Sequence, residues 1–302
     1  MSLTGGLSFS ARMRFLLRKL GRPRVWRRLF VERLTEPLHL NIMSLFVALF
    51  GTLRARIAFD LVVRQQHAFG LLRAADSARA LGRDRVIAVE FGVASGAGLL
   101  NLCEVARRVT GTTGVKFEIV GFDTGTGMPE PIDYRDHPEH YATGDFPMDR
   151  PALAAKLPPN ARVIYGDVAE TVTNFLGEVT RDAPLGFVAL DLDYYSSSRA
   201  ALRLLADPDP SKYLPLVPIY LDDVAFPAHN EWCGELLAVK EFNADCELRK
   251  IGKYNFLRNT RVFKNPAWID HMYTLQVLDH PARQAGAARA SQERLVLDNP
   301  YL

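Results

Sequence analysis

A regular alternation of short apolar runs and helical stretches begins near residue 86, and it most constrains how this chain can fold. The apolar runs that predict strands lie at 86–91, 116–122, 162–165, 185–191 and 216–221. The stretches that predict helices lie at 97–109, 168–178, 196–206 and 230–243. Because helical stretches alternate with buried strands, the pattern predicts an α/β fold with a mostly parallel sheet covered by helices on both faces.

The segments on either side of this pattern differ from it. Residues 1–82 carry apolar residues at helical spacing and end at Gly82, which predicts a helical N-terminal extension that starts with a basic arm. Residues 83–265 are expected to form the ligand-binding domain, in which 246–264 resembles an antiparallel hairpin that closes the sheet. Residues 266–302 are expected to form a C-terminal helix and tail.

The charge of the chain is unevenly distributed. Residues 1–35 hold nine Arg or Lys and one Glu, a charge of +8, so with a net charge of +3 the rest of the chain carries −5. A basic arm on a mildly acidic body fits a partner with negative charge, either a membrane surface, through a peripheral contact, or an acidic polymer, and no nucleic acid is expected. A solvated helical arm explains the same charges, and a homo-oligomer is compatible with the sequence.

Cysteine usage and hydropathy indicate the compartment. The three cysteines, Cys103, Cys233 and Cys246, have no CxxC spacing, which favours a reducing compartment over a disulfide scaffold or a zinc site. The longest apolar run, 42–51, is too short to span a bilayer, and no signal peptide is evident. We therefore expect a cytoplasmic protein that can lie on a membrane surface through its basic arm.

Four aspartates follow two of the expected strands. Asp191 and Asp193 end the fourth strand and share one face of the extended chain, where two like charges about 4 Å apart repel by roughly 4 kcal/mol. Asp222 and Asp223 end the fifth strand, so all four carboxylates should meet at one edge of the sheet. Such a cluster predicts a site for an oxygen-preferring cation such as Mg²⁺, although helix capping explains single members of it.

A glycine-rich turn follows the first expected strand. In "VIAVEFGVASGAG", Glu90 precedes Gly92 and Gly96, and a helical stretch comes next. The dinucleotide pattern GxGxxG fails, because its third glycine would fall at Asn101. An acid two residues before the first glycine fits an S-adenosylmethionine turn, in which Ala94 takes the place where a middle glycine is often found. Alone, such a turn is a weak signal.

Further acids lie at the ends of the next two strands. Asp123 ends the second strand, where its carboxylate can accept both hydroxyls of a ribose, and Thr124 follows it. Asp167 follows the third strand, where it can accept from an adenine amine, with Val168 beside it. Ligands of open α/β sheets bind at this edge. Both aspartates are also ordinary turn or helix-cap residues, so each taken singly leaves function and capping open.

Taken in order, these motifs resemble a known enzyme family. The segments "EFGVASGAG", "GFDTGTGMPE", "GDVAETV", "DLDYYSSS" and "LDD" are similar in order and spacing to those of the macrocin O-methyltransferase-like (TylF-type) enzymes, over roughly residues 85–245. The resemblance implies a Rossmann-like class I methyltransferase fold with a seven-stranded sheet, and S-adenosylmethionine and Mg²⁺ as cofactors.

The resemblance also implies roles for individual residues. It implies Asp191, Asp222 and Asp223 as metal ligands and Asp193 as the general base. His229, a short loop beyond Asp223, is a second candidate for the base or for an acceptor contact, although a lone histidine is a weak signal. The residues expected to bind the cofactor, from the turn and the strand ends, are Glu90, Gly92, Ala94, Gly96, Asp123, Thr124, Asp167, Val168 and Asp191. The expected function is metal-assisted O-methylation of a hydroxyl on a small molecule or sugar. The stretches "DYYSSS" and "DDVAFPAHNEW" and the first 80 residues depart from the family pattern and leave the acceptor open.

Two other functions fit the same residues. The first is a non-catalytic binding or accessory protein that keeps the fold and docks through its basic arm. The second is another metal enzyme, but oxygen chemistry usually needs two histidines and a carboxylate, and no such pair ends an expected strand. The long loop at 129–149 could cover the acceptor, and its histidines, His137 and His140, are expected at the surface.

Overall fold

The computed structural model describes residues 30–225 and 228–283 and contains a seven-stranded sheet in the order β3-β2-β1-β4-β5-β7-β6. Strands β1 to β5 are parallel, β7 pairs antiparallel with β5, and β6 pairs antiparallel with β7. The strands are β1 Arg85–Phe91, β2 Lys116–Asp123, β3 Ala161–Tyr165, β4 Leu185–Leu190, β5 Leu216–Leu221, β6 Arg249–Lys253 and β7 Met272–Val277. The expected Rossmann-like α/β fold is confirmed.

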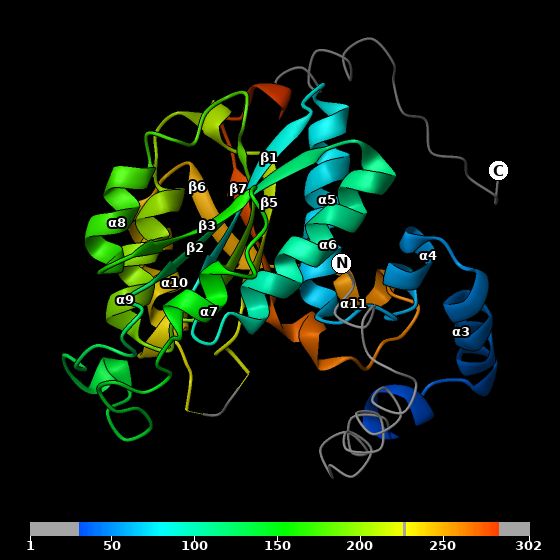
Figure 1. Ribbon diagram of the computed structural model, residues 1–302, viewed down its shortest axis with the longest axis horizontal. Coiled ribbons are helices and arrows are strands. Elements are labelled where there is room, and N and C mark those ends of the chain that lie inside the picture. Colours follow the sequence, from blue (N-terminus) through cyan, green and yellow to red (C-terminus); the bar gives the residue numbers. More distant parts are fainter. Residues whose placement is uncertain (1–29, 226–227, 284–302) are drawn as a thin grey trace, which may run out of the picture.

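The central strands are continuous apolar segments because both faces of the sheet are covered. Every residue of β4 is buried, and β1 is buried after its first residue. Helices α5 (Gln65–Ala80) and α6 (Ala97–Thr113) cover one face, while α8 (Val168–Phe175), α9 (Tyr195–Ala201) and α10 (Gly234–Asp245) cover the other (Figure 1). This two-sided burial is what the runs of Val, Ile, Leu and Phe predicted.

The N-terminal extension is helical where the structure describes it. A π-helical turn at Phe30–Leu34 leads into α3 (Leu38–Phe50) and α4 (Leu53–Ala58), and the Thr52 hydroxyl caps α4 by accepting from the Ala55 N–H. Residues 1–29, which hold most of the basic arm, lie outside the described residues. None of the described helices is long and apolar enough to cross a membrane.

Buried polar contacts fasten the extension to the segment before β7, beside which it lies in Figure 1. Asp60 accepts from the Arg261 guanidinium at 2.6 Å, and both side chains are buried. Glu36 accepts from the Asn265 N–H at 2.9 Å and also from the Lys264 N–H. Removing one partner of such a buried charged pair leaves the other uncompensated, so the extension is an integral part of the packed structure.

The expected hairpin at 246–264 is wrong in its second strand. After β6 the chain forms a short helix, α11 (Leu257–Thr260), and a 3-10 turn at Ala267–His271, and only then enters β7. The apolar residues around Phe263 do not form a strand. Phe263 is fully buried and packs edge to face on Phe59 of the N-terminal extension.

The sheet therefore continues past the boundary expected at residue 265. Residues 266–283 contribute the 3-10 turn, strand β7 and, at 281–283, the start of a helix, while residues 284–302 lie outside the described residues. The remaining short elements are α7 Arg150–Ala154 and 3-10 turns at Tyr134–Asp136, Leu202–Leu205 and Pro210–Lys212.

Helix α5 lies so close to the sheet that one of its positions accepts only glycine, and a glycine of α6 in open space provides the comparison. A Cβ on Gly70 of α5 would lie 2.2 Å from the ring of Phe187, which is fully buried on β4, whereas a Cβ on Gly111 of α6 would meet nothing within 4 Å. We expect Gly70→Ala to destabilise the protein by about 1–3 kcal/mol through overpacking. The matched Gly111→Ala should stabilise it by up to about 1 kcal/mol through helix propensity. Urea unfolding of both variants measures this, and equal effects would contradict the close approach.

Candidate functional site

Carboxylates from the ends of β4 and β5 converge as the sequence predicted. Asp191, Asp193 and Asp223 each offer an oxygen, and these oxygens lie within 4.8 Å of one another. Asp193 reaches this position with a left-handed backbone, at a φ of 58°. Three carboxylates at such separations, with no Lys or Arg paired to them among the described residues, form a donor set typical of hard divalent ions.

The protonation equilibria of this cluster are strongly shifted. Burial, followed by the nearby charges of Asp222 and Asp193, raises the pKa of Asp191 to about 8. Burial and then Asp193 raise the pKa of Asp223 to about 9. The Oδ2 atom of Asp223 is buried and has no hydrogen-bond partner among the described residues. An unsatisfied buried carboxylate oxygen fits a bound cation, which would supply the missing charge.

Asp222 is placed differently from the other three aspartates. The Tyr220 hydroxyl donates a hydrogen bond to its Oδ1 atom, and Asp222 is not one of the three residues whose oxygens converge. It still lies close enough to raise the pKa of Asp191. The structure thus brings Asp193 into the position that the resemblance gave to Asp222, and the assignment of Asp222 as a ligand stays a prediction.

Glu235 lies beneath the cluster and was missed by the sequence reasoning. This first-turn residue of α10 is fully buried, and its carboxylate accepts from the backbone N–H groups of Leu192 at 3.5 Å and Asp223 at 3.2 Å. Burial, followed by the charges of Asp223 and Asp191, raises its pKa well above the usual range. Glu235 therefore connects the ends of β4 and β5, and nothing in the motif "CGELL" distinguished it from an ordinary helix-terminal glutamate.

The glycine turn lies against the end of β4. Gly92 has a φ of 80°, and a Cβ on it would lie 1.7 Å from the carbonyl oxygen of Asp191, so no other residue fits here without moving the strand. Ala94 also adopts a left-handed φ, 47°, which explains why a glycine suits that position. Gly96 has a φ of 79° and begins α6. The turn and the acidic cluster are thus in direct contact.

Asp123 shapes this turn from the end of β2. Its Oδ2 accepts from the N–H groups of Val93 at 2.9 Å and Ala94 at 2.8 Å, and its Oδ1 accepts from Gly125 at 2.6 Å. A carboxylate has about four acceptor positions, so three are used here. The Thr124 hydroxyl donates to the Gly127 carbonyl at 2.6 Å. Asp123 therefore holds the turn, and its predicted contact with a ribose would have to use the remaining position or replace one of these bonds.

Glu90 is buried behind the turn rather than displayed on it. A Cβ on Gly98 would lie 1.9 Å from its Oε1, so the carboxyl group packs beneath the first turn of α6. Burial raises the pKa of Glu90 to about 8, while the positive charge of Arg64 acts in the opposite direction. Arg64, at the start of α5, also lowers the pKa of Asp191 and was missed by the sequence reasoning because it precedes the sheet.

Asp167 caps a helix, which is one of the two roles that the sequence left open for it. Its Oδ1 accepts from the Ala169 N–H at 2.7 Å at the start of α8, whose first residue is Val168. Asp167 remains at the carboxyl edge of the sheet, and its predicted contact with an adenine stays a prediction.

The loop at 129–149 is anchored next to the acidic cluster. Asp136 is fully buried, and its carboxylate accepts from the Ser196 N–H and hydroxyl, both at 2.8 Å, which caps α9 from a distant part of the chain. Burial, followed by nearby Asp193, raises the pKa of the Tyr141 hydroxyl. The loop thus contributes a tyrosine to the edge of the site.

Three histidines gather beside this loop. His137 is 2% exposed, so its expected surface position is wrong, whereas His140 is exposed as expected. The rings of His137 and His229 lie 4.4 Å apart between centroids. Burial first, and then the nearby His137, lowers the pKa of His229, which favours the neutral form of this imidazole. Its pKa also responds to the charge of Asp193, which places it near the cluster.

Comparisons with known proteins give structural similarities only. No protein-family model matches the chain, and no curated protein sequence matches it. The crystal structure of the calicheamicin methyltransferase CalS11 is similar at 19% identity, over 78% of this chain and 85% of that one, with a TM-score of 0.43. The O-methyltransferase NovP is similar at 17% identity over 60% and 72% of the two chains, with a TM-score of 0.39. The O-methyltransferase TomG from Streptomyces achromogenes is similar at 14% identity over 71% and 79%, with a TM-score of 0.35.

The raised pKa values of the cluster predict an unusual pH dependence in the absence of metal. The folded pKa of Asp191, about 8, lies above its unfolded value of about 4, so between these values the folded state binds more protons. Stability should therefore be greatest at low pH within this window and fall as the pH rises toward 8. Melting temperatures from pH 5 to 9 in chelator measure it.

Two matched variants distinguish the pH dependence of stability that comes from the cluster from that of other titratable groups in the chain. Asp191→Asn should flatten the fall by several degrees, whereas Asp182→Asn at an exposed carboxylate should leave it unchanged. A wild-type profile parallel to that of Asp191→Asn would show that the cluster does not control the pH dependence.

Proposed function

We propose that the protein is an S-adenosylmethionine-dependent O-methyltransferase that uses a divalent metal ion. The observation that carries this proposal is the contact between the glycine turn at Gly92 and the end of β4 at Asp191, which joins a nucleoside-type turn to a cluster of three carboxylates. A methyl donor bound at the turn would therefore lie next to an ion bound at the cluster. The expected fold class supports the same activity without fixing it.

The donor would occupy the carboxyl edge of the sheet. Its contacts are proposed from the turn (Glu90, Gly92, Ala94 and Gly96), from the ends of β2 and β3 (Asp123, Thr124, Asp167 and Val168) and from Asp191. The left-handed turn at Gly92 and Ala94 allows the backbone to approach a ligand closely, and the N-terminus of α6 faces the same edge. Asp123 keeps one acceptor position for a ribose hydroxyl, as its three backbone bonds allow.

The ion would be held by oxygen ligands. Asp191 and Asp223 are proposed as ligands, with Asp222 as the third by resemblance and Asp193 as the third by proximity. The buried, unsatisfied Oδ2 of Asp223 and the raised pKa values of Asp191 and Asp223 support a cation at this place. When bound, Mg²⁺ or a similar ion supplies positive charge that lowers the pKa of an acceptor hydroxyl.

The chain's own residues would then move one proton and orient one oxygen. Asp193 accepts the proton of the acceptor hydroxyl, with neutral His229 as the second candidate base. As the new O–CH₃ bond forms, the S–CH₃ bond of the donor breaks, which leaves a methyl ether, S-adenosylhomocysteine and one proton on the base. Holding both reactants in line at the sheet edge supplies much of the rate. The Tyr141 hydroxyl lies near Asp193, whose charge contributes to the raised pKa of this hydroxyl.

The acceptor would be a hydroxyl of a small molecule or sugar. A hydroxyl with a second oxygen beside it suits an ion with open coordination positions. Tyr141 of the loop at 129–149 lies close enough to the cluster for its pKa to respond to Asp193, so this loop is the segment proposed to contact the acceptor. The alternative of a non-catalytic binding protein predicts donor binding without methyl transfer.

Donor binding and turnover test the proposal with one set of variants. Calorimetry should detect S-adenosylmethionine binding to the wild-type protein. Asp191→Asn should abolish metal-dependent release of S-adenosylhomocysteine from a panel of sugar and diol acceptors, while changing donor affinity by less than about tenfold, or about 1.4 kcal/mol. Asp182→Asn is the control at an exposed carboxylate.

Each negative result would exclude a different part of the proposal. No binding heat with the donor would exclude a methyltransferase. Donor binding without turnover on any acceptor would favour the accessory protein. Turnover that persists in chelator and in Asp191→Asn would exclude the metal but keep the donor.

A further inference from the structure

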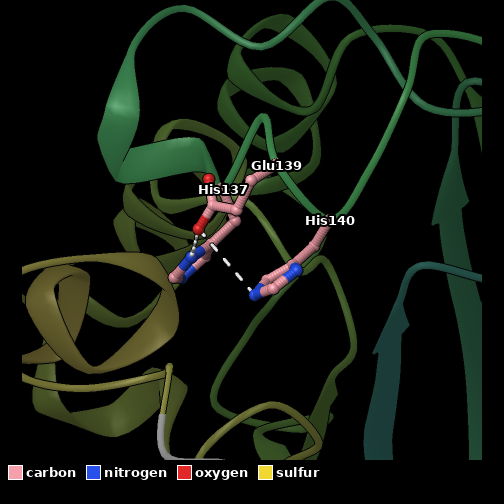
Figure 2. A group of neighbouring side chains, drawn as sticks. All are labelled: His137, Glu139 and His140. Carbon is pink, nitrogen blue, oxygen red and sulfur yellow. Dashed lines mark hydrogen bonds and ion pairs between the residues drawn. The ribbon is translucent and has the colours of Figure 1, made fainter.

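We propose that His137, Glu139 and His140 form a binding site for a zinc-type transition-metal ion, distinct in donor type from the carboxylate cluster. The three side chains lie on the loop at 129–149 and point toward one another, with dashed lines from the Glu139 carboxylate to each imidazole (Figure 2). None of them has a role in the proposed methyl transfer.

The separations of the donor atoms suit a tetrahedral ion. Glu139 Oε1 lies 3.3 Å from His137 Nδ1 and 3.8 Å from His140 Nε2, and all three donor atoms lie within 4.8 Å of one another. A tetrahedral ion about 2.1 Å from each ligand places its ligands roughly 3.4 Å apart. A small rotation of the exposed His140 side chain is therefore sufficient to complete the triad.

The donor types favour zinc-like metals over Mg²⁺. Two imidazoles and one carboxylate form a set that binds Zn²⁺ and similar ions, whereas Mg²⁺ and Ca²⁺ prefer oxygen ligands alone. Three protein ligands leave a fourth position for water or another molecule. Because the side chains of His140 and Glu139 are 46% and 58% exposed, that position faces solvent.

The first ligand is held in place before any ion binds. His137 is 2% exposed and has a left-handed φ of 52°, directly after Asp136, which is bonded to Ser196. The N–H of His140 donates to the His137 carbonyl at 2.9 Å, and this turn brings the two imidazoles to the same side of the loop. A buried, fixed ligand reduces the ordering that metal binding requires.

A second observation concerns the other ring nitrogen of His137. Its Nε2 is buried and has no hydrogen-bond partner among the described residues. An ion at Nδ1 would fix the proton on Nε2, and such N–H groups usually donate to a neighbouring acceptor. A Cβ on Gly234 would lie 3.1 Å from this Nε2 and 3.3 Å from His229 Nδ1, so both nitrogens border the same point. The rings of His137 and His229 lie 4.4 Å apart between centroids, so His229 is the neighbouring imidazole of this ligand.

Titration of the full chain with Co²⁺ and Zn²⁺ tests this site. After treatment with chelator and its removal, one equivalent of Co²⁺ should give the visible absorption of a four-coordinate ion with histidine ligands, and Zn²⁺ should displace it. His140→Ala, at an exposed side chain, should weaken binding at least about tenfold, and Glu139→Gln should also weaken it. His39→Ala, at an exposed histidine in α3, is the matched control and should bind as the wild type does.

Two results would overturn the proposal. One is wild-type affinity in both His140→Ala and Glu139→Gln. The other is loss of the Co²⁺ spectrum in Asp223→Asn with no loss in His140→Ala, because the ion would then occupy the carboxylate cluster. Neither result depends on whether the protein transfers methyl groups.

A different observation carries a second proposal: we infer that α3 binds the surface of an anionic membrane. This helix contains no Asp, Glu, Lys or Arg. Its exposed large apolar side chains are Leu38, Ile42, Met43, Leu45, Phe46, Leu49 and Phe50. Most of them follow the spacing i, i+4, i+7, i+8 and i+11, which places them along one stripe, while Ser44 and Val47 on the other side are buried.

The positive charge of the N-terminal segment indicates which partner covers this apolar stripe. Residues 1–35 carry +8, and all of this net charge lies before residue 30, because the charges of Glu32 and Arg33 cancel. A second copy of the chain would carry the same positive charge, which opposes association, whereas anionic lipid attracts it. Apolar side chains beside a basic segment are the combination that holds peripheral helices at a bilayer surface.

Vesicle sedimentation tests the membrane contact. The wild-type protein should bind vesicles that contain phosphatidylserine, bind neutral phosphatidylcholine vesicles weakly, and lose binding as salt is raised. Leu45→Glu with Phe46→Glu should reduce binding roughly tenfold or more, because the stripe loses apolar area and gains negative charge. Leu248→Glu, at an exposed leucine before β6, is the matched control.

Unchanged vesicle binding in the double variant would overturn the proposal. So would a wild-type dimer in lipid-free solution that the double variant converts to a monomer, since α3 would then be a subunit interface.

Discussion

Burial of neighbouring carboxyl groups at the ends of β4 and β5 is the constraint on which the site depends. Asp191 and Asp223 resist ionisation, with pKa values raised to about 8 and 9, and Glu235 lies beneath them with a raised pKa of its own. Burying these groups is costly unless protons or a cation compensate. Two backbone N–H groups donate to Glu235 and fix both strand ends, so the cluster is preserved as a unit that favours positive charge.

The N-terminal extension belongs to this site as well as to the surface. Arg64 stands at the start of α5 and lowers the pKa of Glu90 and Asp191 against the effect of burial. Helix α5 packs on β1, β4 and β5, and the ion pair between Asp60 and Arg261 ties the preceding turn to the segment before β7. At residue 82 the sequence changes from helical spacing to alternating strands and helices. The packed core nevertheless continues across this point, so residue 82 is not a boundary between separate structural units.

The sequence predicted what depends on local pattern and missed what depends on contacts between distant residues. The parallel strands and the aspartates that end them were predictable, because apolar runs mark buried strands and parallel strands end at one edge. Glu235 and Arg64 were not, since their roles come from packing against strands far away in the chain. The second hairpin strand failed for the same reason: Phe263 has β-type neighbours but packs on the extension.

The loop at 129–149 brings a second donor chemistry to an edge where the strands supply only oxygen. Carboxylates select hard ions and imidazoles select zinc-like ions, so the two sets can be filled independently. Asp136 fixes the loop on α9, and Tyr141 lies near Asp193, which belongs to the carboxylate cluster. An ion held by His137 and its neighbours would restrict the segment that leads directly into Tyr141. Order in this loop would then be linked to the surroundings of the proposed base.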